Sequence, residues 1–131
     1  YPAWTSITPC PGEQWQAVAL HEIAHALDLA DEYLDPNRSS EVGRGEPNYA
    51  TSTDLGTLPW REHCTEQPPT ARSIFLNGQA PPTDPDFVGL FQGARYRQDY
   101  YRPANLCLMR FTTVHRFCPV CARHLRDRIV N

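Results

Sequence analysis

The sequence predicts a small α+β domain in which two helices enclose a long, turn-rich middle. The first observation is the stretch Gln14–Leu29, which has no Pro or Gly and in which apolar residues recur at helical spacing. The second is the region 34–85, where Pro, Gly, Asn and Asp cluster and predict turns. The third is the segment Pro119–Val130, which starts with Pro and carries Arg towards its end, as helices do. We therefore expect residues 1–131 to form one domain, or the C-terminal part of one.

Between the two predicted helices, regular structure is expected to be sparse. Short strands are predicted at Ser73–Leu76 and Phe87–Phe91, where apolar residues lie between turn signals. A long, weakly structured stretch is uncommon in a compact domain unless it is functional or held by other contacts. Residues 1–13 contain four turn formers and are interpreted as a lead-in to the first helix.

Composition and charge exclude several classes of function. The 131 residues include 12 basic residues, all of them Arg, and 15 acidic ones, which gives a net charge of −3. This balance argues against a nucleic-acid partner. The run Arg95–Arg102 mixes Arg with Tyr as single-strand binders do, but in an acidic chain it is better interpreted as a loop at the wall of a cleft. No apolar run reaches the roughly 18 residues that a membrane-spanning helix needs, so no membrane partner is expected.

The first predicted helix carries the motif His21-Glu22-Ile23-Ala24-His25. Residues four apart lie on one face of a helix, so His21 and His25 can direct two imidazoles at one metal ion. Glu22 adjoins His21, where it can reach a water on that metal without being a ligand. The motif therefore predicts a zinc site with a general base beside it.

A catalytic zinc needs a third protein ligand if water is to keep the fourth position. Asp31 follows His25 by six residues and can return to the metal if the helix ends and the chain turns near Asp28. Asp is among the few residues that tolerate the left-handed conformation of such a turn. Glu32 is the first alternative ligand and Glu46 a weaker one, since both carry carboxylates able to bind zinc.

The pattern HExxHxxxxxD, followed by the single Met109, resembles the metzincin group of zinc endopeptidases. From about Ala17 to Arg123, further segments resemble the bacterial IgA metallopeptidase family. These segments are LADEY (Leu29–Tyr33), Pro59-Trp60, GLFQGARY (Gly89–Tyr96), Tyr101-Arg102-Pro103, CLMR (Cys107–Arg110) and FCPVC (Phe117–Cys121).

This resemblance implies a metzincin-like zinc peptidase domain with an active-site helix and a Met-turn at Met109. It implies His21, His25 and Asp31 as zinc ligands and Glu22 as the base. Metzincins usually have Gly where this chain has Asp28, and they place a twisted sheet before the active-site helix. Because only 13 residues precede the helix, we expect a second chain or a removed segment to supply that sheet, or the fold to be a reduced one.

The function implied is zinc-dependent endopeptidase activity on a protein or peptide substrate. A hydrogen-bond donor for the oxyanion is also needed. A Tyr near the Met-turn has this role in some metzincins, and among Tyr96, Tyr100 and Tyr101 we favour Tyr101. Two alternatives stay open: a catalytically silent, zinc-bearing binding module and an archaemetzincin-like aminopeptidase. The location is left open, with a secreted or extracytoplasmic one slightly favoured.

The five cysteines allow a second metal site or disulfides. Cys118 and Cys121 have the Cys-x-x-Cys spacing of a zinc half-site, and Cys107 and Cys64 could complete a structural zinc site. Archaemetzincin relatives have such a site near a similar arrangement. Disulfides are the alternative if the protein is secreted, and free or redox-active thiols are the third. Cys10 would then be the odd cysteine, although a Cys10–Cys64 pair is open.

Other polar residues are expected to have structural or solvent-exposed roles. A single histidine is more often a surface or structural residue than part of a site. The loop oxygens have no EF-hand spacing and are expected to be solvated. These histidines are His63, His115 and His124, and the loop residues are Asp35, Asn37, Glu41, Glu46 and Asn48.

Overall fold

The helix that carries the His-Glu-x-x-His motif is α1, Gln14–Ala26, in a computed structural model that describes residues 14–38 and 45–130. It ends three residues before the predicted end at Leu29. The reason is Asp28, which has a φ of 72° and so lies in the left-handed region that breaks a helix. The predicted turn at Asp28 is therefore confirmed.

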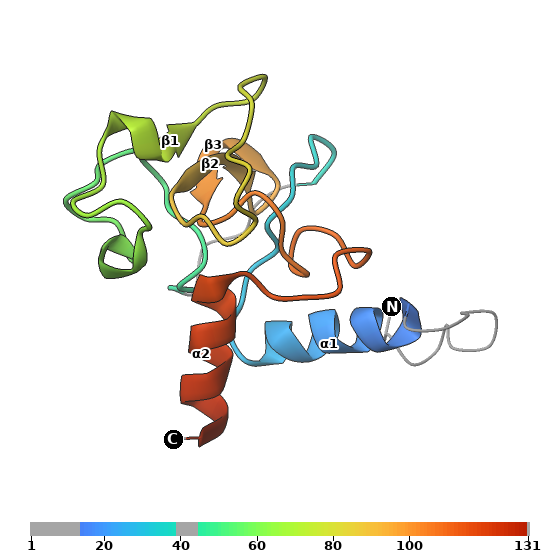
Figure 1. Cartoon of the computed structure of the whole chain (residues 1–131). Helices are drawn as coiled ribbons and strands as arrows, with labels where there is room; N and C mark the ends of the chain where they lie inside the picture. The colour runs from blue at the N-terminus through green and yellow to red at the C-terminus, as the bar shows by residue number, and fades with distance from the viewer. Residues whose placement is uncertain (1–13, 39–44, 131) are drawn as a thin grey trace.

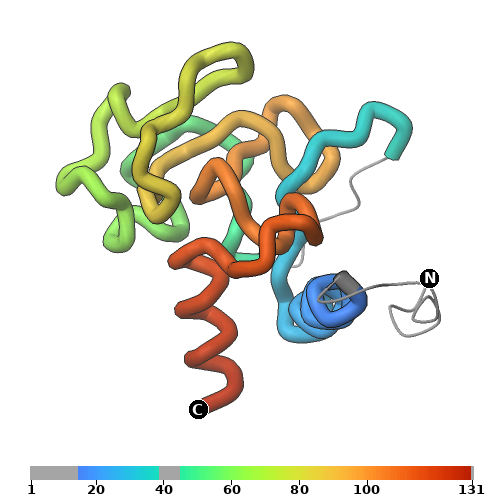
Figure 2. Tube along the Cα trace, turned by 45° about the vertical axis from the view of Figure 1, so that its right-hand side comes forward, coloured from blue at the N-terminus to red at the C-terminus, as the bar shows by residue number. Residues whose placement is uncertain are grey.

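The second helix, α2 (Pro119–Val130), has the predicted bounds. Figures 1 and 2 show α2 beside the C-terminal end of α1, with the three-stranded sheet above the two helices in these views. The contact is polar: a ring nitrogen of His124 lies 2.7 Å from the Leu27 carbonyl oxygen. Arg128 also forms an ion pair with Asp28. The expected structural role of His124 is thus confirmed.

A three-stranded sheet with the order β1-β2-β3 lies between the helices in sequence. β1 (Ile74–Phe75) runs parallel to β2 (Leu90–Ala94), and β2 runs antiparallel to β3 (Arg97–Arg102). The first two strands overlap the two predicted ones. The expectation of a loop at 95–102 is wrong, because β3 is a polar edge strand whose first residues are exposed and give no apolar signal.

A two-residue turn, Arg95-Tyr96, joins β2 to β3. Both residues have positive φ, 48° and 73°, as the tight hairpin turns require. For a residue as bulky as Tyr this conformation costs about 1–3 kcal/mol. Hydrogen bonds from outside the hairpin offset that cost: the Arg95 amide donates to the Asp31 carbonyl (2.8 Å) and the Tyr96 amide to the Tyr33 carbonyl (2.9 Å). The hairpin turn is thus fixed against the segment that follows α1.

The turn-rich middle is held by the core. It contains the short 3₁₀ helices η2 (Arg61–His63) and η3 (Ala71–Ser73). Trp60 is fully buried beside η2, and its indole N–H donates to the Gly89 carbonyl at the start of β2 (2.7 Å). Within the described ranges, neither helix is long and apolar enough to cross a membrane.

Replacing a core residue of the sheet should destabilise the fold. Leu90 in β2 is fully buried, so Leu90→Ala should lower the free energy of unfolding by about 2–5 kcal/mol, because it leaves a cavity. Urea unfolding at fixed metal content measures the change. Leu76→Ala is the matched control, since Leu76 is 45% exposed and its truncation should cost under about 0.5 kcal/mol. Equal losses in both variants would contradict this placement of the core.

Candidate metal centre

His21 and His25 lie one turn apart on α1, as the motif predicts. Their Nε2 atoms are 3.1 Å apart, and the two rings meet edge to face with centroids separated by 4.7 Å. His21 is buried, whereas the His25 side chain remains 32% exposed. The helix therefore brings two ligand atoms to one point that solvent can reach.

Asp31 joins them after the left-handed turn at Asp28. Its Oδ1 lies 2.9 Å from His21 Nε2 and 3.0 Å from His25 Nε2, and the residue is 6% exposed. The three predicted ligands are thus brought together, and we call His21, His25 and Asp31 the triad. They form one of two groups in the described ranges with ligand atoms close enough to share a metal ion.

The outer hydrogen bonds of the histidines orient both rings. His21 Nδ1 donates to the Leu108 carbonyl (3.0 Å), and His25 Nδ1 donates to the Leu29 carbonyl (2.9 Å). Because a carbonyl oxygen only accepts, the proton of each neutral imidazole lies on Nδ1. The Nε2 atoms of both rings therefore face each other and the Asp31 carboxylate. Burial alone would lower the pKa of each ring, but the hydrogen bond with Asp31 raises it, so a cation at this point, either a proton on Nε2 or a metal ion, is favoured.

The spacing of the three atoms fits zinc. Zn–N and Zn–O bonds of about 2.0 Å in a tetrahedron place neighbouring ligand atoms roughly 3.3 Å apart. The observed separations of 2.9, 3.0 and 3.1 Å are close to that value. Three protein ligands leave the fourth position open, as in catalytic rather than structural zinc sites.

Asp31 is also held by a tyrosine. The Tyr96 hydroxyl donates a hydrogen bond to Asp31 Oδ2. Burial alone would raise the pKa of Asp31, but hydrogen bonds from His21, His25 and Tyr96 hold it well below its usual value. Burial and the Asp31 carboxylate together raise the pKa of the Tyr96 hydroxyl, which keeps its proton.

Tyr101, the predicted oxyanion donor, does not lie beside the triad. Its partly buried side chain packs against the hydrophobic core, and its backbone exchanges hydrogen bonds of 2.8 Å with Ala50. Tyr96 takes the place beside the triad because the two-residue turn directs it towards Asp31.

Glu22 lies at the edge of an open cleft. The carboxylate is exposed and close enough to His25 for its charge to favour the protonated form of that ring. The cleft measures about 480 Å³ and has His21, Glu22 and Phe111 in its walls. A separate, smaller depression of about 160 Å³ is lined by His25, Asp31 and Tyr96.

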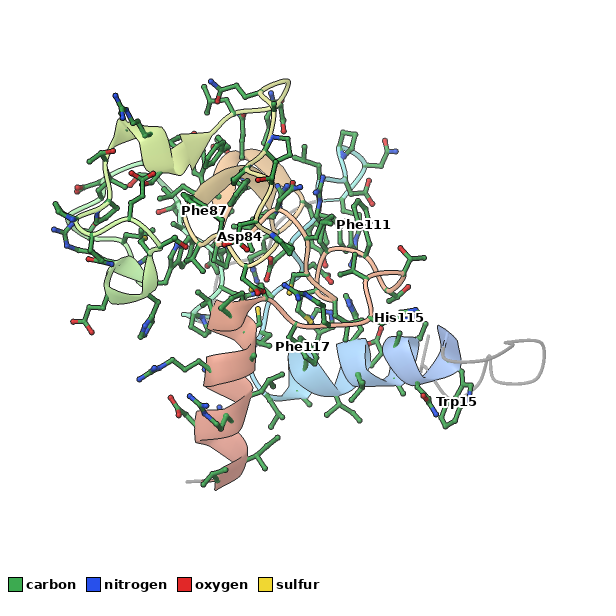
Figure 3. All side chains as sticks on the ribbon, in the orientation of Figure 1. Trp15, Asp84, Phe87, Phe111, His115 and Phe117 are labelled. Carbon is green, nitrogen blue, oxygen red and sulfur yellow. The ribbon has the colours of Figure 1, made fainter. Side chains whose placement is uncertain are left out.

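The turn at Met109 supports the triad through its backbone. Met109 is fully buried, and its carbonyl accepts the Glu32 amide at 2.9 Å. The preceding carbonyl, of Leu108, is the acceptor for His21. The loop that follows runs along α1, where His115 and Phe117 lie above the helix (Figure 3) and line an apolar pocket with Leu108.

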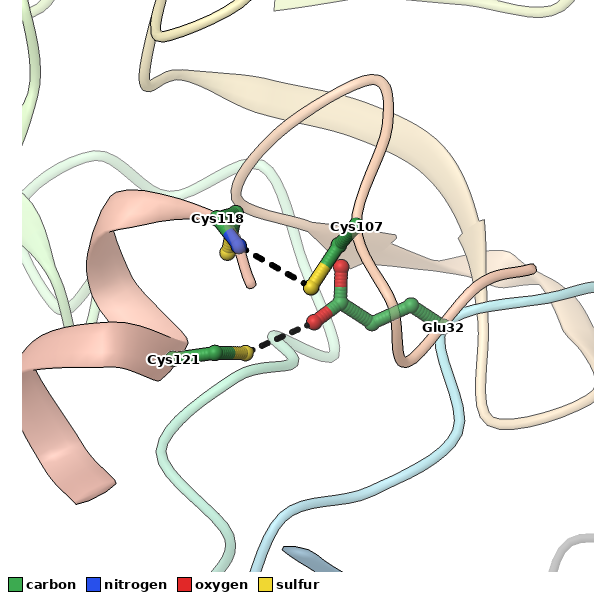
Figure 4. A group of neighbouring side chains, drawn as sticks. All are labelled: Glu32, Cys107, Cys118 and Cys121. Carbon is green, nitrogen blue, oxygen red and sulfur yellow. Dashed lines mark hydrogen bonds between the residues drawn. The ribbon is translucent and has the colours of Figure 1, made fainter. Parts of the chain in front are cut away.

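The second group consists of Glu32, Cys107, Cys118 and Cys121, all fully buried (Figure 4). Glu32 belongs to this group, so its prediction as an alternative third ligand of the triad is wrong. The four described cysteines are free thiols, so the disulfide alternative is wrong for them. The inclusion of Cys64 in a four-cysteine site is wrong too. Its thiol contacts the Trp60 carbonyl at 3.8 Å and lies outside the group.

The charge state of this group is set by burial. Burial raises the pKa of Glu32 well above its usual range, and it raises the pKa of Cys107 to about 12. Burial likewise raises the pKa of Cys121. Cys118 differs, because hydrogen bonds from Cys107 and Cys121 lower its pKa to about 6.

Asn48 has a structural role that its sequence context does not predict. Instead of lying in a solvated loop, it is fully buried and exchanges two hydrogen bonds of 2.8 Å with the Ala30 backbone. It also donates to Glu32 at 2.9 Å. Asn48 lies in a turn-rich sequence, and nothing in its local pattern distinguishes it from exposed neighbours.

The remaining candidates lie outside both groups. Glu46 forms an ion pair with Arg95 (3.3 Å) and so is not a third ligand. His63 and His115 are exposed, as expected. Cys10 and Glu41 lie outside the described residues.

Comparisons with protein-family models and with curated proteins find no match for this chain.

Removing the carboxylate of the triad should release its metal. We expect Asp31→Ala to bind one zinc fewer per chain than the native protein. Loss of a residue that only hydrogen-bonds to a metal ligand lowers metal affinity by roughly 10–100-fold, so loss of a ligand itself should lower the zinc affinity of the triad by more. Metal analysis after gel filtration measures the stoichiometry. Asp99→Ala, at an exposed acid on β3, is the matched control and should retain native zinc. Native zinc content in Asp31→Ala would refute the ligand assignment.

Proposed function

We propose that this chain is a zinc-dependent endopeptidase that hydrolyses peptide bonds with metal-activated water. One observation carries the proposal: ligand atoms of His21, His25 and Asp31 converge on one point near the surface. His21 lines an open cleft together with Glu22, and His25 and Asp31 line a second, smaller depression. The resemblance of the HExxHxxxxxD pattern and its flanks to the IgA metallopeptidase family supports the same activity. IgA itself does not follow as the substrate, because a shared fold or motif does not fix side-chain pockets.

The exposure of the triad favours catalysis over a purely structural metal. Structural zinc sites use four protein ligands and exclude solvent, whereas catalytic sites keep one position for water. Here the triad has three ligands, and the 32% exposed ring of His25 adjoins open depressions on the surface. Water and a substrate carbonyl can therefore reach the fourth position.

The residues around the triad supply the proton transfers. When bound, zinc lowers the pKa of water and polarises the carbonyl of the peptide bond. The Glu22 carboxylate accepts a proton from the attacking water and delivers it to the leaving amine, which makes Glu22 both base and acid. His21 and His25 keep their orientation through the Leu108 and Leu29 carbonyls.

Tyr96 is the donor best placed for the oxyanion. Its hydroxyl contacts Asp31, so it lies near any metal that the triad holds, and it keeps its proton. Such a donor stabilises the negative charge that develops on the carbonyl oxygen. The contact with Asp31 gives Tyr96 this role in our proposal, in place of Tyr101.

The open cleft suits an extended polypeptide. It is lined by Phe111, Thr112 and Thr113 on the loop after Met109, and by Val18 on α1. Apolar and hydroxyl side chains on opposite walls can contact both the side chains and the backbone of an extended peptide. We therefore propose an unstructured protein or peptide as the substrate.

The decisive experiment separates hydrolysis from metal binding. Glu22→Gln should retain native zinc, because Glu22 is not a ligand, while hydrolysis falls by about 10²–10⁴-fold through loss of the base. The substrate is an unstructured peptide blocked at both ends, and products are identified by mass spectrometry. Glu62→Gln, at an exposed position on η2, is the matched control with unchanged turnover.

Other outcomes of this experiment would contradict parts of the proposal. Undiminished turnover in Glu22→Gln would show that Glu22 is not the general base. Cleavage of free but not of blocked peptides would favour an aminopeptidase. A zinc-loaded chain that cleaves neither peptide would favour a binding module.

Tyr96 and Tyr101 can be distinguished by removing each hydroxyl. Tyr96→Phe should lower kcat by about 10²-fold with little change in KM, because the lost hydrogen bond forms in the transition state. Tyr101→Phe should keep native kcat, since that ring packs against the core. Zinc content is measured in both variants to confirm an intact triad. A loss of kcat in Tyr101→Phe alone would reverse this assignment.

A further inference from the structure

We propose that Glu32, Cys107, Cys118 and Cys121 form a second zinc site, closed to solvent and structural in role. This site is separate from the triad and is argued from different atoms, so it does not depend on the proposed peptidase activity. We call these four residues the Cys₃Glu site.

The four side chains converge from three separate parts of the chain. Cys107 precedes the Met109 turn, Cys118 and Cys121 bracket the start of α2, and Glu32 follows Asp31. One ligand atom from each lies within 4.8 Å of the others. Figure 4 shows the Glu32 carboxylate facing the cysteine sulfurs. Four converging ligands are the number that a tetrahedral structural zinc site requires.

One carboxylate oxygen of Glu32 is buried among these side chains without a hydrogen-bond partner. Its Oε2 is 3.0 Å from Cys121 Sγ and accepts from Asn48 at 2.9 Å, whereas its buried Oε1 has no hydrogen-bond partner. A buried carboxylate oxygen without a partner is costly, because it has lost its hydration. A metal ion among the sulfurs would satisfy it.

Two backbone amides point towards the Cys107 sulfur. The Cys118 amide donates to Cys107 Sγ at 3.2 Å, and the Met109 amide approaches the same sulfur at 3.5 Å. Hydrogen bonds to sulfur of this kind are a recognised way of tuning metal-bound thiolates. When the ion binds, the thiol protons leave to solvent, and the ligands remain as three thiolates and one carboxylate.

Burial excludes the redox interpretation of Cys118-Pro-Val-Cys121. A redox-active or nucleophilic cysteine must be reached by its partner, yet the three cysteines have no exposed surface. Thiolates with one carboxylate in a tetrahedral set suit zinc better than magnesium or calcium, which prefer oxygen ligands. Ligand atoms within 4.8 Å of one another suit a single ion.

A cobalt spectrum can detect this site without any measure of hydrolysis. The reduced full-length chain is loaded with Co²⁺ in place of zinc. Thiolate ligands give a sulfur-to-cobalt charge-transfer band, whereas the triad has no sulfur ligand. We expect the band in the native chain, saturating at one Co²⁺ per chain, and an unchanged band in Asp31→Ala. No band in the native chain would overturn the proposal, whatever the peptidase assays give.

Variants then locate the site. Cys118→Ser should abolish the band and lower bound zinc from two to one per chain. Cys64→Ser is the matched control, because Cys64 is buried but outside the site, and it should retain both. Glu32→Gln should keep a weaker sulfur band and lose at least about tenfold in Co²⁺ affinity. A band lost in Cys64→Ser and kept in Cys118→Ser would overturn this ligand set. If Cys118→Ser does not fold, the native spectrum still decides.

Discussion

Both ligand groups depend on the backbone hydrogen bonds that hold two consecutive acids, Asp31 and Glu32, with their side chains in different directions. The Asp31 carbonyl accepts the Arg95 amide from the hairpin turn at 2.8 Å, and the Glu32 amide donates to the Met109 carbonyl at 2.9 Å. Asn48 holds the preceding Ala30 by two further bonds. One carboxylate therefore enters the triad and the other enters the Cys₃Glu site. A shift of one residue in this segment would disrupt both.

The second constraint is the loop Cys107–Met109, which has no regular secondary structure. Its three residues serve three purposes: the Cys107 sulfur faces Glu32, the Leu108 carbonyl orients His21, and the Met109 carbonyl binds the Glu32 backbone. Such a loop is positioned by its contacts, since no helix or strand fixes it. This explains how a chain with so little regular structure can hold the side chains of each group with their possible ligand atoms within 4.8 Å of one another.

Local patterns predicted the parts of the site that depend on local geometry. Helical spacing was sufficient for His21 and His25, and the tolerance of Asp for positive φ was sufficient for the turn at Asp28. Long-range placement could not be predicted in this way. Tyr96 reaches Asp31 because a two-residue turn rotates it there, and adjacent tyrosines look equivalent in sequence. Likewise, contacts with distant segments decide that Asp31 enters the triad and Glu32 the other group, and the sequence next to the two acids does not show this.

The two ligand groups differ in exposure, and this difference supports the different roles that we propose for them. The triad reaches the surface through His25, so water can reach its ligand atoms. The Cys₃Glu site has no exposed surface, so an ion there can act only on the fold. Glu32 and Cys121 are 89 residues apart in sequence, and joining them closes a large loop whose entropy is lost from the unfolded chain. A small, turn-rich domain gains most from such a cross-link, because its core alone supplies little stability. Because Glu32 adjoins Asp31, the same cross-link would also hold the third ligand of the open site in place.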